Sequence, residues 1–265
     1  VYKISEKYGI FTLKVLPPDR RPQFRDSKCA ARLLWDGWCL RSFARILDRP
    51  QKGWEDKMPA YFNLSLQFRR EDLYPDFVKD FFDALELAGL KYLSGYGEAA
   101  SDSRGEIIQW NQQKLEKDFV LGFTEHFSHG YRQVLYSFRE YSEVRGFWMN
   151  QYPEKDCFTY EIIIPEEDVL IHEGGGAFQK EHEEAIVELA ERLWNFPCIR
   201  AIQTGLEGDD ASVGLREIEL GKMPNMYPFA ILEVMYGNEE IEEAVQLKGE
   251  RMGWLLRRHL VFSSE

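Results

Sequence analysis

A strand, a helix and a second strand follow one another between residues 157 and 207, and no other stretch constrains the fold as strongly. Apolar side chains alternate along the first strand, at Phe158, Tyr160, Ile162 and Ile164. The helix that follows has apolar residues three and four positions apart, at Ile186, Leu189, Ala190, Leu193 and Trp194. Residues 199–205 are typical of a second strand, so the stretch predicts a β-α-β unit over residues 157–207.

Residues 61–98 have a similar pattern. Phe62, Leu64, Leu66 and Phe68 alternate with Asn63, Ser65 and Gln67, which predicts a strand with one buried and one solvated face. A helix follows with its apolar stripe at Phe77, Phe81, Phe82, Leu85 and Ala88, and Gly89 marks its end. We interpret the two β-α-β units as an internal duplication, one in each half of the chain. The alternative stays open, because any two β-α-β units look alike at this level.

The rest of the chain adds strands and one more helix. Residues 131–152 are rich in aromatic residues and predict a hairpin, while residues 213–220 and 227–236 predict two further strands. Residues 238–262 have apolar residues at helical spacing, with acids at the start and Arg257, Arg258 and His259 at the end, which predicts a C-terminal helix. The fold class is therefore α+β, with a mixed, largely antiparallel sheet, two β-α-β units and a C-terminal helix.

We expect two α+β halves, residues 1–152 and 153–265, or one compact unit that contains both. The first half starts with a basic segment, because residues 1–50 contain 11 Lys and Arg against 5 Asp and Glu. The second half is acidic: residues 154–243 contain 6 Lys and Arg against 22 Asp and Glu, in a chain of net charge −12. Such a surface repels nucleic-acid phosphates and anionic lipids, and it attracts basic proteins. We therefore expect a basic protein partner and no nucleic acid.

Two features indicate a cytoplasmic protein. No run of about 18 apolar residues is present, so no membrane span is expected, and residues 1–15 lack the apolar core of a signal peptide. The four cysteines (Cys29, Cys39, Cys157 and Cys198) are far apart and form no C-x-x-C pair, which favours free thiols in a reducing compartment.

No catalytic or cofactor motif is complete. His126 and His129 are three residues apart, as two metal ligands on one helix face would be, but the H-E-x-x-H order is absent. His172 precedes Glu173 and three glycines, and that glycine run lacks the Lys and Ser/Thr of a phosphate-binding loop. We therefore predict no catalytic residue, no metal and no cofactor. The sequence does not indicate an oligomeric state.

Two functions remain. The first is a non-enzymatic binding protein whose acidic half covers a basic partner, in its most concrete form an intracellular inhibitor such as a bacterial immunity protein that neutralises a toxin or nuclease. The partner-binding residues predicted for it are acidic: Glu166, Glu167, Asp168, Glu173, Glu181, Glu184, Glu188, Glu191, Asp209 and Asp210. A solvated surface without a partner is the plainer explanation for any one of them. The second function is an enzyme or small-molecule-binding protein with a site between two similar α+β halves.

Overall fold

The computed structural model describes residues 60–95, 97, 99, 101–117, 133–149, 156–171, 177–207, 212–235 and 241–258. The chain divides into two compact units, Val1–Glu55 and Asp56–Glu265, and every described residue belongs to the second. Its strands are β1 (Tyr61–Arg69), β2 (Lys91–Gly95), β3 (Val134–Ser137), β4 (Val144–Met149), β5 (Cys157–Pro165), β6 (Ile199–Leu206), β7 (Phe229–Leu232), β8 (Glu243–Gln246) and β9 (Trp254–Arg257). Its helices are η3 (Arg70–Asp72), α2 (Phe77–Ala88), α3 (Arg104–Glu116), α4 (Glu166–Val169), α5 (Lys180–Trp194) and α6 (Leu215–Glu219).

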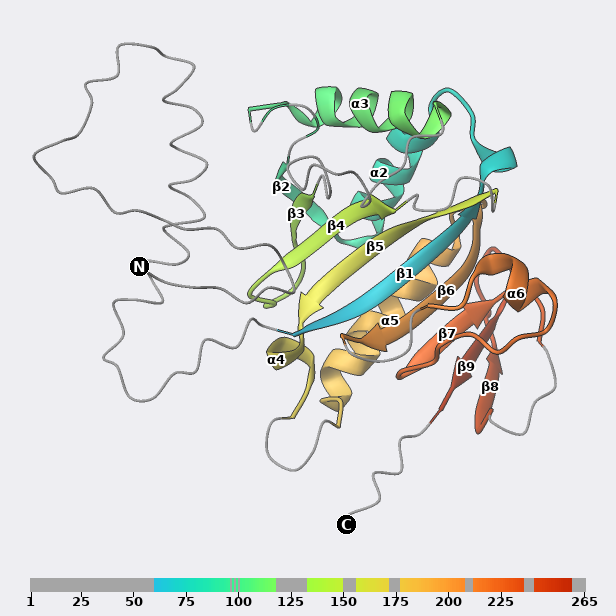
Figure 1. Ribbon diagram of the computed structural model, residues 1–265. Helices are drawn as coiled ribbons and strands as arrows, with labels where there is room; N and C mark the ends of the chain where they lie inside the picture. Colours follow the sequence, from blue (N-terminus) through green and yellow to red (C-terminus); the bar gives the residue numbers. More distant parts are fainter. Residues whose placement is uncertain are drawn as a thin grey trace, which may run out of the picture. The chain divides into compact units, whose positions relative to one another are not determined.

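The strands form one sheet in the order β2-β3-β4-β5-β1-β6-β7-β9-β8 (Figure 1). Every pair of neighbouring strands among these nine is antiparallel. The prediction of an α+β fold with a largely antiparallel sheet is therefore confirmed.

Strand β1 lies in the middle of this sheet. It pairs with β5 on one side, where Ser65 faces Glu161, and with β6 on the other side, where Ser65 faces Gln203. Because β1 comes from residues 1–152 while β5 and β6 come from residues 153–265, both predicted halves contribute strands to one sheet.

The two predicted β-α-β units are present as runs of elements, β1-α2-β2 and β5-α5-β6. Strands β5 and β6 are parallel to each other, with only β1 between them, whereas β5, β4 and β3 lie between β1 and β2. The two connections therefore span different numbers of strands. The internal duplication stays a prediction.

Helices α2 and α5 cover the same face of the sheet (Figure 1). On this face lie the predicted apolar residues of β1 and β5, all of them buried: Phe62, Leu64, Leu66, Phe68, Phe158, Tyr160, Ile162 and Ile164. Helix α2 buries the predicted stripe against them and ends at Gly89, whose φ of 110° is left-handed and therefore suits glycine. Sequence periodicity located this part of the core correctly.

The second face of the sheet differs from the prediction. Asn63, Ser65 and Gln67 were expected to be solvated, yet Ser65 is 1% and Gln67 is 2% exposed. Gln67 and Gln203 both donate to the carbonyl oxygen of Val213, each at 2.8 Å, which holds the segment before α6 against this face. Helix α6 packs at the β6–β7 end, and no described helix lies over β4, β5 and β1 on this side (Figure 1).

Two element predictions are wrong. The C-terminal helix does not form, because residues 243–246 and 254–257 are the strands β8 and β9, and β9 pairs with β7. The strand expected over residues 213–220 is instead helix α6, whose Leu215 and Ile218 are buried three positions apart. In both places the backbone follows the packing against β6 and β7 rather than the local pattern. Among the described residues, no helix has the length and apolar character needed to cross a membrane.

Candidate functional site

Helix α5 presents an acidic stripe opposite its buried face. Ala185, Ile186, Leu189, Ala190 and Leu193 are buried, while Glu181, Glu184 and Glu191 are exposed. Glu188 lies on the same stripe and is half-buried. The helical period of 3.6 residues places these four glutamates, all of them predicted partner-binding residues, in one row.

The glutamates of this row differ in how far they are neutralised. Glu188 forms ion pairs with Arg139 at 2.6 Å and with Arg192 at 2.5 Å. Glu184 has a long pair with Lys180, at 3.7 Å. Glu181 and Glu191 have no ion pair within the described residues, so no neighbouring cation there offsets their negative charge.

Helix α4 supplies a second acidic group, next to the start of α5. Asp168 is occupied within the fold, because the amide N–H and the hydroxyl of Ser142 donate to its Oδ2 at 2.8 and 2.7 Å. Glu166 accepts from the amide of Glu207 at 3.2 Å, and Glu167 is exposed. Glu173, Asp209 and Asp210 lie outside the described residues, as do His126, His129 and His172.

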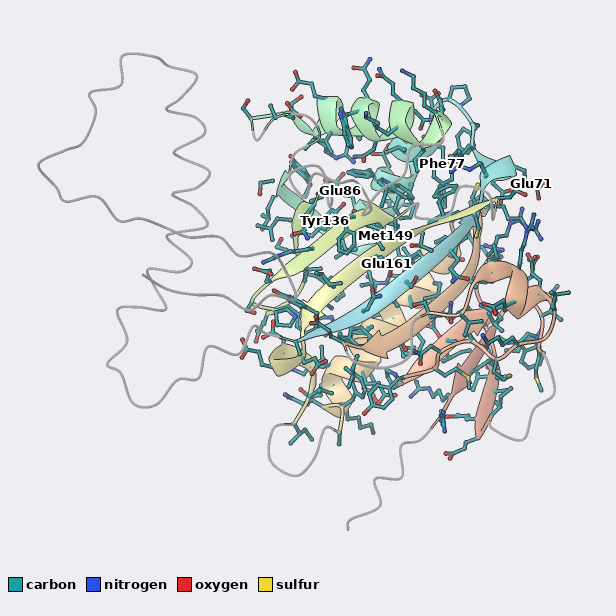
Figure 2. The ribbon with its side chains drawn as sticks, in the orientation of Figure 1. Glu71, Phe77, Glu86, Tyr136, Met149 and Glu161 are labelled. Carbon is teal, nitrogen blue, oxygen red and sulfur yellow. The ribbon has the colours of Figure 1, made fainter. Side chains whose placement is uncertain are left out.

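The structure also reveals a polar cluster that the sequence analysis did not identify. Glu161 lies on β5 and is 8% exposed, on the second face of the sheet (Figure 2). Its Oε1 accepts hydrogen bonds from the hydroxyl of Thr159 and from that of Ser65, the latter at 2.9 Å. Asn63 and Gln67 lie on β1 on either side of Ser65, so the residues around Glu161 are polar along two strands.

Burial dominates the electrostatics of Glu161. Loss of water raises its pKa above the ordinary value of 4.5, and the hydrogen bonds from Thr159, Asn63 and Ser65 oppose this shift only in part. Three buried acceptor oxygens of the cluster have no hydrogen-bond partner in the described structure: Glu161 Oε2, Asn63 Oδ1 and Gln67 Oε1. A buried carboxylate with an unpaired oxygen is costly, so this cluster lowers the stability of the fold at neutral pH.

We expect Glu161→Gln to raise the free energy of unfolding at pH 7.5 by roughly 1–2 kcal/mol, because the amide carries no charge and its N–H groups can donate to Asn63 Oδ1. The pKa of Glu161 is higher in the folded protein than in the unfolded chain. The protonated carboxyl therefore stabilises the fold fully at a pH below the unfolded-state pKa, and this stabilisation is lost as the pH rises through the folded-state pKa. The difference between variant and parent should therefore shrink toward pH 4. Urea unfolding at both pH values measures it.

The exposed Glu250→Gln is the control for this comparison, and it should change stability little at either pH. A Glu161→Gln protein that is no more stable than the parent at pH 7.5 would show that the buried carboxylate is not a destabilising group.

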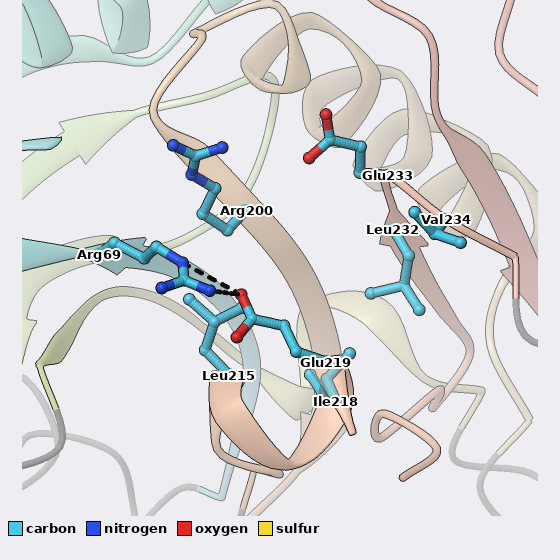
Figure 3. Close-up of a pocket in the computed structure, with 8 residues that line it drawn as sticks. All are labelled: Arg69, Arg200, Leu215, Ile218, Glu219, Leu232, Glu233 and Val234. Carbon is cyan, nitrogen blue, oxygen red and sulfur yellow. Dashed lines mark hydrogen bonds and ion pairs between the residues drawn. The ribbon is translucent and has the colours of Figure 1, made fainter. Parts of the chain in front are cut away.

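A pocket of about 230 Å³ lies beside α6 (Figure 3). Its lining residues are Arg69, Arg200, Leu215, Ile218, Glu219, Leu232, Glu233 and Val234. Both arginines are already paired: Arg69 with Glu219, and Arg200 with Asp72 through two hydrogen bonds of 2.9 and 2.6 Å. The pocket is smaller than most small-molecule sites, which are about 300–1,000 Å³.

The described residues contain no group of three or more His, Cys, Asp or Glu side chains that is placed to hold a metal ion. Cys157 and Cys198 are both half-buried. Burial, with the nearby Asp72 carboxylate, raises the pKa of Cys198, which disfavours the reactive thiolate. The environment of Cys198 is therefore unlike that of an activated nucleophile.

Comparison with protein-family models finds no match, and comparison with curated protein sequences finds none either. The candidates for function therefore come from the geometry alone. They are the acidic stripe of α5 with the neighbouring Glu167, and the polar cluster around Glu161.

Proposed function

We propose that this chain is a non-enzymatic binding protein that uses the acidic surface of α5 and α4 to bind a basic protein. The observation that carries the proposal is the row of exposed glutamates on α5, of which Glu181 and Glu191 lack an ion pair within the described structure. Fixed charges on a rigid helix speed association with a partner of opposite sign and select against acidic ones.

The most concrete form of this function is an intracellular inhibitor, such as a bacterial immunity protein that covers the cationic active site of a toxin or nuclease. The excess of acids over bases across residues 154–243 supports it, because a nuclease site that binds phosphates is itself basic. The four widely spaced cysteines, which form no C-x-x-C pair, agree with a cytoplasmic location.

Charge reversal of the α5 stripe tests this proposal. The variant Glu181→Lys/Glu184→Lys/Glu191→Lys leaves Glu188 in place, because Glu188 pairs with Arg139 and Arg192 and so contributes to the fold. We expect the parent protein to retain a basic partner at low salt, and the variant to bind that partner about tenfold more weakly or worse. Native capture followed by mass spectrometry identifies the partner, and titration at two salt concentrations measures the affinity.

The matched control makes the same change in net charge at three separate places, in the variant Glu71→Lys/Glu116→Lys/Glu250→Lys. All three of these side chains are exposed, and none lies on α4 or α5. If both variants lose the partner equally, binding depends on overall charge and not on the α5 surface. If the parent retains no basic protein at low salt, the proposal fails.

One observation favours the alternative, an enzyme or small-molecule-binding protein with a site between two similar halves. Glu161 on β5 and Ser65 on β1 come from different predicted halves, and they meet in the centre of the sheet at 2.9 Å. A ligand bound at this cluster would contact both halves of the proposed duplication.

A further inference from the structure

We propose that the cluster of Asn63, Ser65, Gln67, Thr159 and Glu161 is a binding site for a guanidinium group. This inference goes beyond the proposed function, since the cluster lies on the sheet face opposite α5. Side chains of a strand alternate between faces, and the neighbouring Tyr160 and Leu66 point into the core that α2 and α5 cover.

The cluster offers acceptors in excess of donors. The hydroxyl groups of Ser65 and Thr159 both donate to Glu161 Oε1, and the side-chain amide of Asn63 also donates to this carboxyl group, so these donors are used. The amide nitrogen of Gln67 donates to Val213, which leaves its Oε1 as the group available to a ligand. Glu161 Oε2, Asn63 Oδ1 and Gln67 Oε1 therefore await hydrogen-bond donors, and at least one of those donors should carry a positive charge.

No described cation fills this role. Arg145 lies on β4, the strand next to β5, but its Nε pairs with Glu143 at 2.5 Å and its Nη1 donates to Gln133 at 3.2 Å. A metal ion is a poor fit because Glu161 is the only carboxylate of the cluster, and an anion would meet three acceptor oxygens. A guanidinium presents five N–H donors in one plane, so it satisfies several acceptors at once.

The border of the cluster also suits a guanidinium better than an ammonium. Phe147 and Met149 on β4 are the cross-strand neighbours of Glu161 and Thr159, so an aromatic and a thioether side chain adjoin the polar group. Figure 2 labels Met149 and Glu161 in this part of the sheet. A guanidinium is weakly hydrated and stacks on apolar and aromatic surfaces, whereas an ammonium holds its water strongly.

The test is a titration of the full chain with methylguanidinium, using methylurea as the neutral probe of the same shape. We expect methylguanidinium to shift the backbone amide NMR signals of Ser65, Thr159 and Glu161, and methylurea to leave them unchanged. Glu161→Gln should weaken methylguanidinium binding at least tenfold, while the exposed Glu250→Gln should not change it. Asn63→Ala is a second variant, expected to weaken binding severalfold without removing the carboxylate.

A further arm identifies the source of the guanidinium. Tighter binding of the tripeptide acetyl-Gly-Arg-Gly-amide than of methylguanidinium indicates an arginine side chain of a protein. Binding of methylguanidinium alone indicates a small molecule. The inference is overturned if neither probe shifts these signals, or if Glu161→Gln binds methylguanidinium as well as the parent does. A negative result in this titration does not bear on the proposed function, because that proposal is tested by capture of a basic partner with the α5 variants.

Discussion

Replacing Phe68 by alanine should lower the free energy of unfolding by about 3–5 kcal/mol, the cost of removing a fully buried aromatic ring from a packed core. The ring of Phe68 lies at the centre of an aromatic cluster on the face that α2 covers. It stacks on Phe158 with centroids 5.3 Å apart, and it contacts Phe77, Phe81 and Trp148 at 5.3–5.6 Å. The cluster joins β1, β4, β5 and α2, so a cavity there weakens contacts between four elements.

Urea unfolding followed by far-UV circular dichroism measures this loss. Phe68→Leu fills most of the space and should cost clearly less, because a cavity penalty scales with the volume left empty. Leu87→Ala removes an apolar side chain from α2 that is 86% exposed, and it should change stability little. A loss below about 1 kcal/mol for Phe68→Ala would contradict the packing described for β1 and α2.

The elements of this core could be predicted because their sequence periods are clean. The alternation in β1 and the apolar stripe of α2 correctly assign the residues that are buried between the sheet and this helix, and the left-handed Gly89 ends the helix as expected. The order of strands could not be predicted in this way. Local periods say which face of a strand is buried, but not that β1 lies between β5 and β6.

The second sheet face shows the limit of polarity as a guide to exposure. Ser65 and Gln67 have polar side chains at alternating positions, which is typical of a solvated face, yet both are buried. Their hydrogen-bond partners, Glu161 and Val213, are 96 and 146 positions away in the chain. A signal for the site was present in Glu161 itself, the one charged residue inside the strand 157–165, but it becomes informative only once its neighbours are known.

The acidic surface was partly predictable. The row of glutamates on α5 follows from the helical period, because the same spacing that buries Leu189 and Leu193 exposes Glu181, Glu184 and Glu191. The pairing of Glu188 with Arg139 and the use of Asp168 to hold Ser142 depend on contacts between distant segments. Composition alone counts Glu188 and Asp168 as available to a partner. The structure shows that Glu188 already forms ion pairs and that Asp168 already accepts hydrogen bonds from Ser142.

The C-terminal segment was assigned to the wrong element because its apolar spacing fits a helix. In the structure, Leu255 and Leu256 are buried in β9, and the turn before it contacts the end of α5. The Nε1–H of Trp194 donates to the carbonyl oxygen of Met252 at 3.1 Å, and the guanidinium of Arg251 lies 4.1 Å from the centre of the Trp194 ring. These contacts favour the hairpin over the helix, because a helix here would lose the pairing of β9 with β7.

Arg251 should therefore be a strong determinant of stability, and we expect Arg251→Ala to lower the free energy of unfolding by about 2–4 kcal/mol. Its Nη1 donates to the carbonyl oxygens of Ile199, Phe196 and Trp194 at 2.6, 3.2 and 3.4 Å. The Trp194 carbonyl lies at the end of α5, where carbonyls lack helical partners and the helix dipole favours a positive charge, whereas the Phe196 carbonyl also accepts from the amide of Ile199. The variant thus removes the side-chain donor from the Trp194 and Ile199 carbonyls and removes the cation from the Trp194 ring.

Two further variants separate these contributions, again by urea unfolding. Arg251→Lys keeps the charge but loses the planar group that stacks on Trp194, so its loss should fall between those of the parent and the alanine variant. Arg216→Ala removes an arginine of an exposed pair with Asp156, and it should cost less than about 0.5 kcal/mol.

If Arg251→Ala costs no more than Arg216→Ala, the hairpin does not depend on the contacts that Arg251 makes at the end of α5. If the predicted order holds, one side chain links the last strands of the sheet to the helix that carries the acidic stripe.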